Sequence, residues 1–225
     1  MAKIVKTHDE RRAEILDRAQ QLFYRQGYDQ TSIQEIIDVV GIAKGTFYHY
    51  FGSKIDLLDE LIERILAQTI QSVTPVVEAA DRDALTKFQQ LFRTIESWKV
   101  ENKEFFLGIL HTFYREENMI FRQKVKAASI RAMIPLLTPV IRQGVDEGVF
   151  TTPDPDDIGE IIMTIVHTLA ETAALLILTT ARDQAVLPTI EHKAAVARRA
   201  IARLLGVAQD DLQIFDVTDL RRWFI

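Results

Sequence analysis

The chain has 225 residues, of which 48% are apolar and 26% are charged, a balance typical of a globular protein. The absence of cysteine excludes disulfide bonds and thiolate metal sites, and only nine glycines and six prolines favour long helices over a turn-rich β fold. We therefore expect an all-α protein that needs no cofactor, has no metal site and works in the cytoplasm.

The N-terminal stretch becomes charged at once and lacks the apolar segment of a signal peptide. The most apolar run, residues 161–180, carries His167 and Glu171 near its middle, and a carboxylate at the centre of a bilayer is costly. We expect this run to form a helix buried in the core or at a subunit contact rather than a membrane span.

The net charge of −5 argues against a nucleic-acid partner, but the charges are unevenly distributed. Residues 1–54 contain eight basic and seven acidic side chains, whereas the remainder contains 19 and 25. This asymmetry is too small to identify a DNA-binding region by itself.

Four helices are predicted in the first third of the chain. Thr7 begins a T-x-x-E capping box whose helix ends at Gly27, and Ser32 begins an S-x-x-E box whose helix ends before Gly41. A short helix follows over residues 44–50. Ser53 then caps a long fourth helix that we expect to run to Val73, before Pro75.

Longer amphipathic helices are predicted after Pro75, over residues 83–99, 103–117 and 119–147. Pro135 and Pro139 are expected to kink or break the last of these. Asp154 as the cap and Pro155 at the first helical position predict the start of a helix that runs to about residue 180. A final long helix is expected over residues 188–205.

The helices on either side of Gly41 have the pattern of a helix-turn-helix, because apolar residues that would lock them together occupy suitable positions: Ile36, Val40, Ile42, Phe47 and Tyr50. With Phe47 and Tyr50 inward, the polar residues of the short helix face outward. Lys54, in the first turn of the fourth helix, is expected to clamp a phosphate. The candidate DNA-binding residues are Thr31, Ser32, Lys44, Gly45, Thr46, Tyr48, His49, Tyr50 and Lys54.

The residues from Ala19 to Lys54, among them "AQQLFYRQGY", "TSI" and "GIAKGTFYHYFGSK", closely resemble the DNA-binding region of the TetR/AcrR family of bacterial transcriptional regulators. Ala43 departs from the family pattern where Ser or Thr is usual, and Ile37 departs where Ala is frequent. A looser similarity extends over residues 141–158, which resemble the segment before the family's dimerisation helices.

The resemblance implies three parts: a helix-turn-helix DNA-binding domain over residues 1–53, a connecting helix over residues 54–74, and a ligand-binding and dimerisation domain over residues 75–225. It also implies a homodimer formed through about residues 155–205. Such a dimer would repress transcription from a palindromic operator on double-stranded DNA and would be released by a small-molecule effector.

The effector site is predicted from apolar and polar residues of the C-terminal helices, namely Phe92, Phe106, Leu110, Phe113, Met133, Leu137, Met163, His167 and Glu171. Plain core packing is the alternative for the aromatic residues and methionines. His167 and Glu171 share a helix face and are open to three interpretations: a polar pair at the dimer contact, polar groups of the pocket, or metal ligands. In the pocket, Glu171 would favour an effector that is apolar with some polar or cationic character.

Two other classes of function compete with this interpretation. A helical-bundle enzyme with a di-metal site would need Glu-x-x-His pairs, and none of the five histidines has a glutamate three residues before it. No catalytic residue is predicted. A protein of the same fold could also use its first domain to contact a protein partner instead of DNA, and a salt-dependent interaction with a duplex would distinguish the two.

Overall fold

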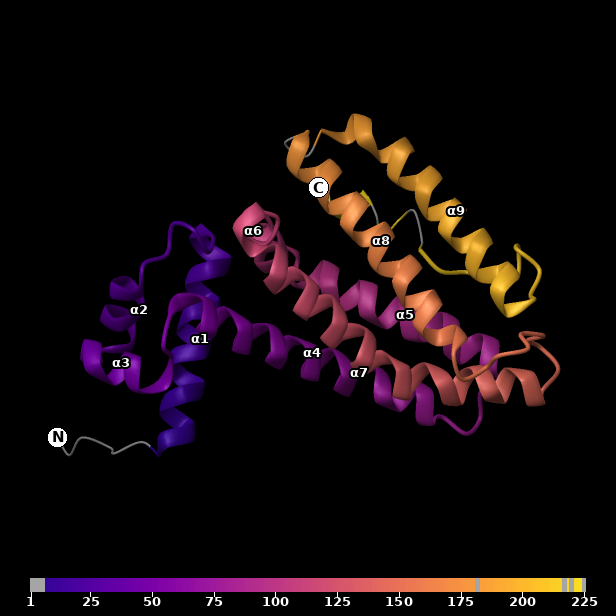
Figure 1. The fold of residues 1–225 in the computed structure, drawn as a ribbon, viewed down its shortest axis with the longest axis horizontal. Helices are drawn as coiled ribbons and strands as arrows, with labels where there is room; N and C mark the ends of the chain where they lie inside the picture. The colour runs from indigo at the N-terminus through magenta and orange to yellow at the C-terminus, as the bar shows by residue number, and fades with distance from the viewer. Residues whose placement is uncertain (1–6, 181–182, 216–217, 219–220, 224–225) are drawn as a thin grey trace. The chain divides into compact units, whose positions relative to one another are not determined.

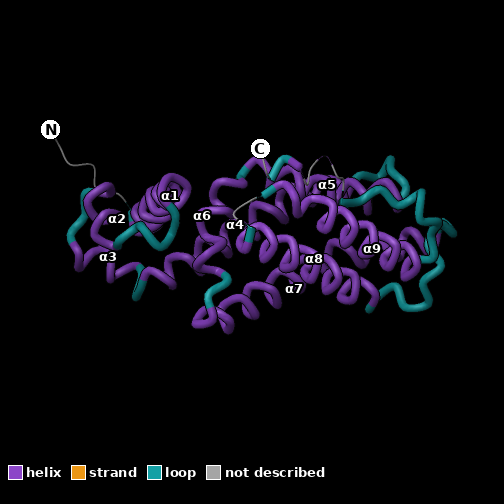
Figure 2. The backbone as a smooth tube through the Cα atoms, turned by 90° about the horizontal axis from the view of Figure 1, so that it is seen from above, coloured by secondary structure: helices purple, strands orange, loops and turns teal. Residues whose placement is uncertain are grey.

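The computed structural model describes residues 7–180, 183–215, 218 and 221–223, and over these residues the protein is helical without a β-strand (Figures 1 and 2). This agrees with the all-α class expected from the sequence. The helices are α1 (His8–Gln26), α2 (Ile33–Val40), α3 (Lys44–Tyr50), α4 (Lys54–Glu78), α5 (Ala84–Glu101), α6 (Lys103–Phe113), α7 (Met119–Asp146), α8 (Ile158–Thr179) and α9 (Leu187–Leu205). Two short 3₁₀ helices, Glu116–Asn118 and Gln184–Val186, precede α7 and α9.

The chain forms two compact units, and α4 runs from one into the other. The first unit comprises residues up to 65 together with residues 103–115, so that it contains α1, α2, α3, the first half of α4 and α6. The second unit comprises residues 66–102 and everything after 115.

The first unit is built around apolar side chains that its helices contribute at helical spacing. Ile15, Phe23, Ile36, Phe47 and Leu61 are all fully buried. Helices α2 and α3, with eight and seven residues, are too short to be stable in water without such packing. The shared core therefore holds the short α2 and α3 in place.

Helix α6 packs closely on α1 because Gly27, just after α1, and Gly108, on α6, meet at the contact. The Tyr28 amide donates a hydrogen bond to the Gly108 carbonyl at 3.3 Å, and a Cβ atom on Gly108 would lie only 2.7 Å from the carbonyl oxygen of Phe23. The absence of a side chain at Gly108 thus allows the two helix backbones to approach each other.

The second unit has one continuous hydrophobic core, to which α5, α7, α8 and α9 contribute; Figure 1 shows α8 and α9 side by side. Phe88, Leu137, Ile162 and Ile201 are among its fully buried members. The segment after α9 adds Leu212 and Ile214, which are also buried, so the C-terminal segment is part of the fold.

The sequence led us to expect that α4 would end before Pro75 and that Pro135 and Pro139 would kink or break α7, but none of the three prolines ends its helix. Helix α4 continues past Pro75 to Glu78, and α7 continues through Pro135 and Pro139 to Asp146. All three rings are on exposed faces, where the backbone carbonyl that loses its partner can be hydrated. The opposite face of α7 is anchored in the core, which keeps the helix continuous.

Two helix boundaries also differ from the prediction. Helix α6 ends at Phe113 rather than near 117, and α8 begins at Ile158 rather than at Pro155. The Asp154 carbonyl accepts hydrogen bonds from the amides of Asp157 and Ile158, and this separate turn precedes the helix. The side chain of Asp154 is therefore not the helix cap.

We expect Gly108→Ala to destabilise the first unit by about 1–3 kcal/mol, because the added methyl group would collide with backbone that cannot move aside easily. Thermal unfolding followed by circular dichroism measures the effect. Gly45→Ala is the matched control, since a Cβ atom there meets nothing within 4 Å and should leave stability equal or higher. Equal melting temperatures for wild type and Gly108→Ala would contradict the close α1–α6 contact.

Candidate nucleic-acid interface

Helix α2 begins with a capping box and ends with a left-handed glycine at the turn to α3. The Ser32 hydroxyl accepts from the Glu35 amide at 3.1 Å, and the Glu35 carboxylate accepts from the Ser32 amide at 2.7 Å. The hydrogen bond from the Ser32 amide to the carboxylate, together with one from the Gln26 side chain, lowers the pKa of Glu35. Gly41 ends α2 with φ +71°, and its amide donates to the Ile37 carbonyl. Both signals were predicted from the sequence.

Helix α3 has one buried side and one exposed flank. Phe47 is fully buried, whereas Lys44, Gly45, Tyr48 and His49 are exposed. Ala43 provides no side-chain cap, and its carbonyl accepts from the amides of Thr46 and Phe47 instead. Thr46 and Tyr50 are half-buried at the edges of the flank. The flank therefore presents a cation, a phenol and an imidazole on a helix of seven residues.

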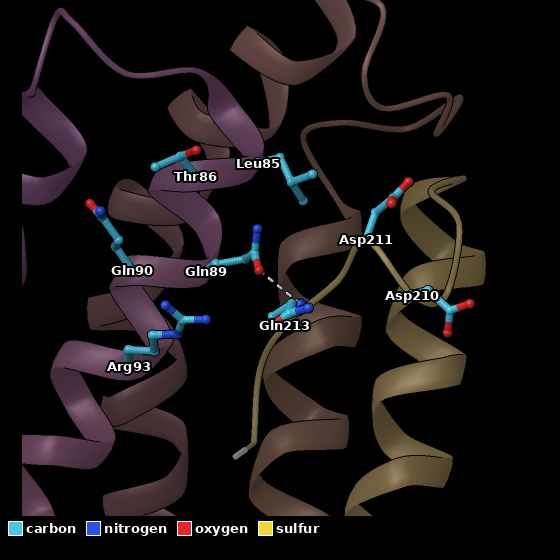
Figure 3. A pocket seen from close by; sticks show the side chains of 8 residues that line it. All are labelled: Leu85, Thr86, Gln89, Gln90, Arg93, Asp210, Asp211 and Gln213. Carbon is cyan, nitrogen blue, oxygen red and sulfur yellow. Dashed lines mark hydrogen bonds between the residues drawn. The ribbon is translucent and has the colours of Figure 1, made fainter.

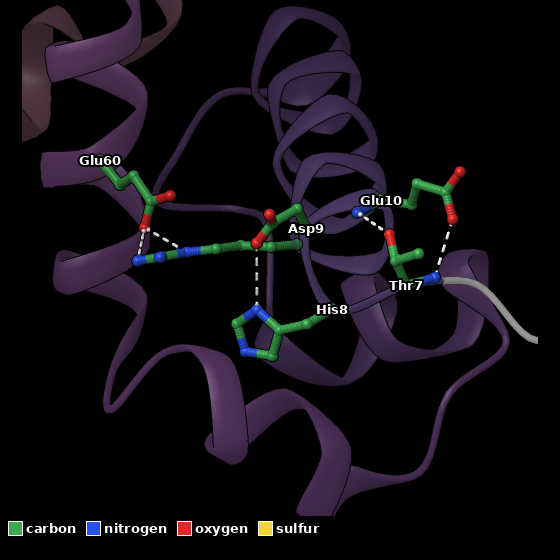
Figure 4. A network of polar contacts seen from close by, with 6 residues as sticks. Thr7, His8, Asp9, Glu10 and Glu60 are labelled. Carbon is green, nitrogen blue, oxygen red and sulfur yellow. Dashed lines mark hydrogen bonds and ion pairs between the residues drawn. The ribbon is translucent and has the colours of Figure 1, made fainter.

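Tyr50 is placed differently from the expectation that it faces inward. Its ring lies 4.6 Å from the ring of His8, the first residue of α1, and the rings of His8 and His49 are 5.8 Å apart. His8 is held by the α1 capping box at Thr7 and contacts Asp9, as Figure 4 shows. His8 was not predicted as a site residue, and its separation from α3 by 35 residues leaves no local signal that could have identified it.

The start of α1 is also tied to α4. Arg12 donates two hydrogen bonds to Glu60, at 2.6 and 3.1 Å, and Arg64 pairs with Asp17 at 2.6 Å (Figure 4 labels Glu60 and marks the hydrogen bonds that it accepts). These ion pairs are partly exposed and contribute little stability individually. Their geometric effect is to link α1 and α4 on either side of the helix-turn-helix.

Two predicted DNA-binding residues have other partners. Thr31 is buried, and its hydroxyl donates to the Gly27 carbonyl at 2.8 Å, so it does not face a ligand in this conformation. The Lys54 ammonium donates to the carbonyls of Tyr28 and Thr31 at 3.0 and 2.9 Å, and burial lowers its pKa. Two of the three N–H donors of Lys54, which was predicted to clamp a phosphate, are therefore used by backbone carbonyls. Burial also raises the pKa of Tyr28 to about 12.

The predicted effector-site residues are divided between the two units of the chain. Four of them, Phe92, Met133, Leu137 and Met163, are packed in the hydrophobic core of the second unit. Three others belong to α6 in the first unit, where they are half-buried: Phe106, Leu110 and Phe113. Glu171 is exposed on α8, whereas His167 on the same helix is half-buried.

His167 combines burial with an unsatisfied polar atom. Its Nε2 atom is inaccessible to solvent and has no hydrogen-bond partner among the described residues. Burial lowers the pKa of His167 to about 4, and the nearby charges of Lys99 and Lys126 lower it further in the same direction. The imidazole is therefore neutral at physiological pH, and its buried nitrogen is available to a ligand or a water.

A surface hollow of about 470 Å³ lies between α5 and the segment after α9, and none of the predicted effector residues is among those that line it. Figure 3 shows polar side chains around it, including Gln89, Arg93 and Asp211, and a hydrogen bond from the Gln213 amide to the Gln89 side chain. The hollow is open and carries charges of both signs.

Helix α8 is unusually apolar for its exposure. Ile161 and Leu175 on α8 are 50% and 43% exposed, and Val196 on α9 is 45% exposed. Within the described part of the chain, α8 alone has the length and hydropathy of a membrane span. This is weak evidence for a membrane, because apolar helices of soluble proteins meet the same criteria.

Comparison with known proteins agrees with this architecture. Residues 15–61 match the family described as bacterial regulatory proteins, tetR family, and residues 110–176 match the tetracyclin repressor-like C-terminal domain. The HTH-type transcriptional repressor KstR2 of Mycobacterium tuberculosis is 26% identical over 161 residues, which cover 69% of this chain and 76% of that protein. The fatty acid metabolism regulator protein of Bacillus subtilis is 25% identical over 137 residues, covering 60% and 68%.

A similar fold occurs in the crystal structure of a TetR-family transcriptional regulator from Pectobacterium atrosepticum. The two structures have a TM-score of 0.64 and 20% sequence identity, and the match covers 89% of this chain and 98% of that one.

We expect the protein to lose up to about 3 kcal/mol of stability between pH 6.5 and pH 4, because the unfolded chain binds a proton at His167 over this range and the folded chain does not. Because the pKa of His167 is lower in the folded protein, its contribution to the free energy of unfolding is complete above pH 6.5. This contribution is lost as the pH falls through the pKa of the folded state. Urea unfolding at several pH values measures it. His167→Leu should remove this part of the pH dependence, and His111→Gln, at an exposed position, should retain it. If the free energy of unfolding changed with pH in the same way for wild type and His167→Leu, this pH dependence would not come from His167.

Proposed function

Because this chain belongs to the TetR family of bacterial transcriptional regulators, we propose that it is a homodimeric repressor that binds a palindromic operator in the cytoplasm and leaves it when a small-molecule effector binds. The observation that carries the DNA-binding part is the exposed polar flank of α3, opposite the fully buried Phe47.

The size and chemistry of this flank suit the major groove of DNA. Seven residues of helix span about 10 Å, and the groove is about 12 Å wide. Lys44 reaches a phosphate or the acceptor edge of guanine, and Tyr48 offers a ring face to a thymine methyl group as well as a hydroxyl donor. His49 adds a donor, and Gly45 permits close approach of the backbone.

A second copy of the chain is the best partner for the exposed apolar faces of α8 and α9. Ile161, Leu175 and Val196 would be removed from water in a dimer, with a gain of about 25 cal/mol per Å² of apolar area. The hydroxyls of Thr164 and Thr168 donate to carbonyls of their own helix, so they need no partner in such an interface. A twofold axis would place two α3 helices on half-sites about 34–36 Å apart, or a multiple of that distance.

The effector that fits best is an apolar molecule with an acidic or hydrogen-bonding group. Glu171 is exposed and so does not support the cationic character first expected, whereas the unsatisfied His167 lies near Lys99 and Lys126. Lys99 pairs with Glu96 at 2.9 Å, and Lys126 forms no ion pair with a described residue. Because one relative is named as a fatty acid metabolism regulator, we would include fatty acids in a screen for effectors.

Selection from a random DNA pool tests the DNA-binding part, and we expect it to return a palindrome. The affinity for this duplex should fall steeply with salt, because about 0.9 counterions are released for each phosphate neutralised. Lys44→Met should reduce the slope of log K against log salt by about 2, one charge being lost in each half-site. Lys124→Met, an exposed lysine of the second unit, should leave the slope unchanged. A protein that bound no duplex at low salt would refute the proposal.

The dimer is tested by Leu175→Arg, which places a charge on the exposed face of α8. We expect this variant to sediment as a monomer and to bind the operator at least tenfold more weakly, because the two half-sites are no longer bound together. Ile120→Arg is the control, since Ile120 is 71% exposed but lies on α7. If Leu175→Arg remained dimeric, another surface would have to form the interface.

A further inference from the structure

Lys54 occupies a junction in the DNA-binding unit. It is the first residue of α4 and follows the last residue of α3 by four positions. Its side chain returns to the loop between α1 and α2, which lies more than twenty residues earlier in the sequence. A single side chain thus connects the end of α3 to the segment that precedes α2.

The ammonium group of Lys54 contacts three protein groups. It donates to the carbonyl oxygens of Tyr28 and Thr31, at 3.0 and 2.9 Å, and lies 4.1 Å from the centroid of the Tyr28 ring. Hydrogen bonds from a charged donor are among the stronger ones, and a cation over an aromatic face is attracted as well. Two of the three N–H donors and one aromatic face are therefore already in use.

The loop that Lys54 contacts is itself ordered by hydrogen bonds. The Thr31 amide donates to the Tyr28 carbonyl at 3.2 Å, and the Thr31 hydroxyl donates to the Gly27 carbonyl at 2.8 Å. Ser32, the next residue, is the cap of α2. The position of Thr31 thus sets where α2 begins, and Lys54 holds the carbonyl of that residue.

We propose that Lys54 is a positioning residue rather than a phosphate ligand. Its hydrogen bonds connect the residue that begins α4, just after α3, to the loop just before α2, so that the helix-turn-helix is fixed at both ends. Rotation of α3 would stretch the Lys54 contacts at one end or the Gly41 turn at the other. The flank of α3 is thereby held at the angle that the groove requires. This inference rests on the proposed DNA-binding function.

The two roles predict different responses to Lys54→Met, which keeps most of the apolar stem and removes the donors. A positioning residue predicts operator binding weaker by about tenfold or more, with an unchanged slope of log K against log salt. A phosphate ligand predicts a slope reduced by about 2 for the dimer, the response expected of Lys44→Met under the same conditions.

Hydrogen exchange on the protein without DNA gives a second, independent measurement. We expect the amides of Thr31, Ser32 and Glu35 to exchange at least tenfold faster in Lys54→Met than in wild type, because the loop loses its anchor. Lys54→Gln, whose amide can still donate to one carbonyl, should give intermediate exchange and intermediate operator affinity. Lys44→Met should exchange like wild type at these three amides.

The outcomes separate the two proposals. Unchanged exchange at the three amides, unchanged operator affinity, or a slope reduced by about 2 in Lys54→Met would each overturn the positioning role. A wild-type protein that bound no duplex would overturn the DNA-binding function instead, while the exchange measurement would still decide what Lys54 does. If Lys54→Met did not fold, Lys54→Gln would decide by the same criteria.

Discussion

The burial of Phe47 is the interaction on which the DNA-binding half depends. A helix of seven residues has no independent stability, so α3 depends on its one fully buried side chain, which lies among the buried apolar side chains of the first unit. Once Phe47 is inside, helical geometry leaves Lys44, Tyr48 and His49 outside. The burial of Phe47 thus determines which side chains of α3 are exposed toward the groove, although these side chains are not buried themselves.

Local signals explain which parts of the fold could be predicted from the sequence. Thr7 and Ser32 with their partner glutamates, and Gly41, act within one turn of helix, and the structure has all three where they were expected. That α4 continues past Pro75 and α7 through Pro135 and Pro139 could not be predicted locally, because the effect of a proline depends on which side of the helix faces solvent, and all three are exposed. Contacts between residues far apart in the sequence could not be predicted from local spacing. Examples are the contact between the rings of His8 and Tyr50 and the hydrogen bond from Lys54 to the Tyr28 carbonyl.

The effector site was harder to predict for a different physical reason. A binding pocket and a packed core are lined by the same residue types, so Leu137 and Met163 could belong to either, and the structure buries both in the core. His167 differs because a polar nitrogen without a partner is costly inside a protein. The unsatisfied nitrogen of His167 is therefore the observation on which our proposal of an effector near it rests.

The close approach of Gly108 to Phe23 has a consequence for how this protein can be divided. Helix α6 follows α5 in the chain, yet it covers a face of α1, so the DNA-reading half is not a contiguous stretch of sequence. Cutting after residue 65 would strip α1 of its neighbour and expose apolar surface that normally never meets water. A chimaera that borrows the operator specificity of this protein should therefore carry residues 103–115 along with the first 65.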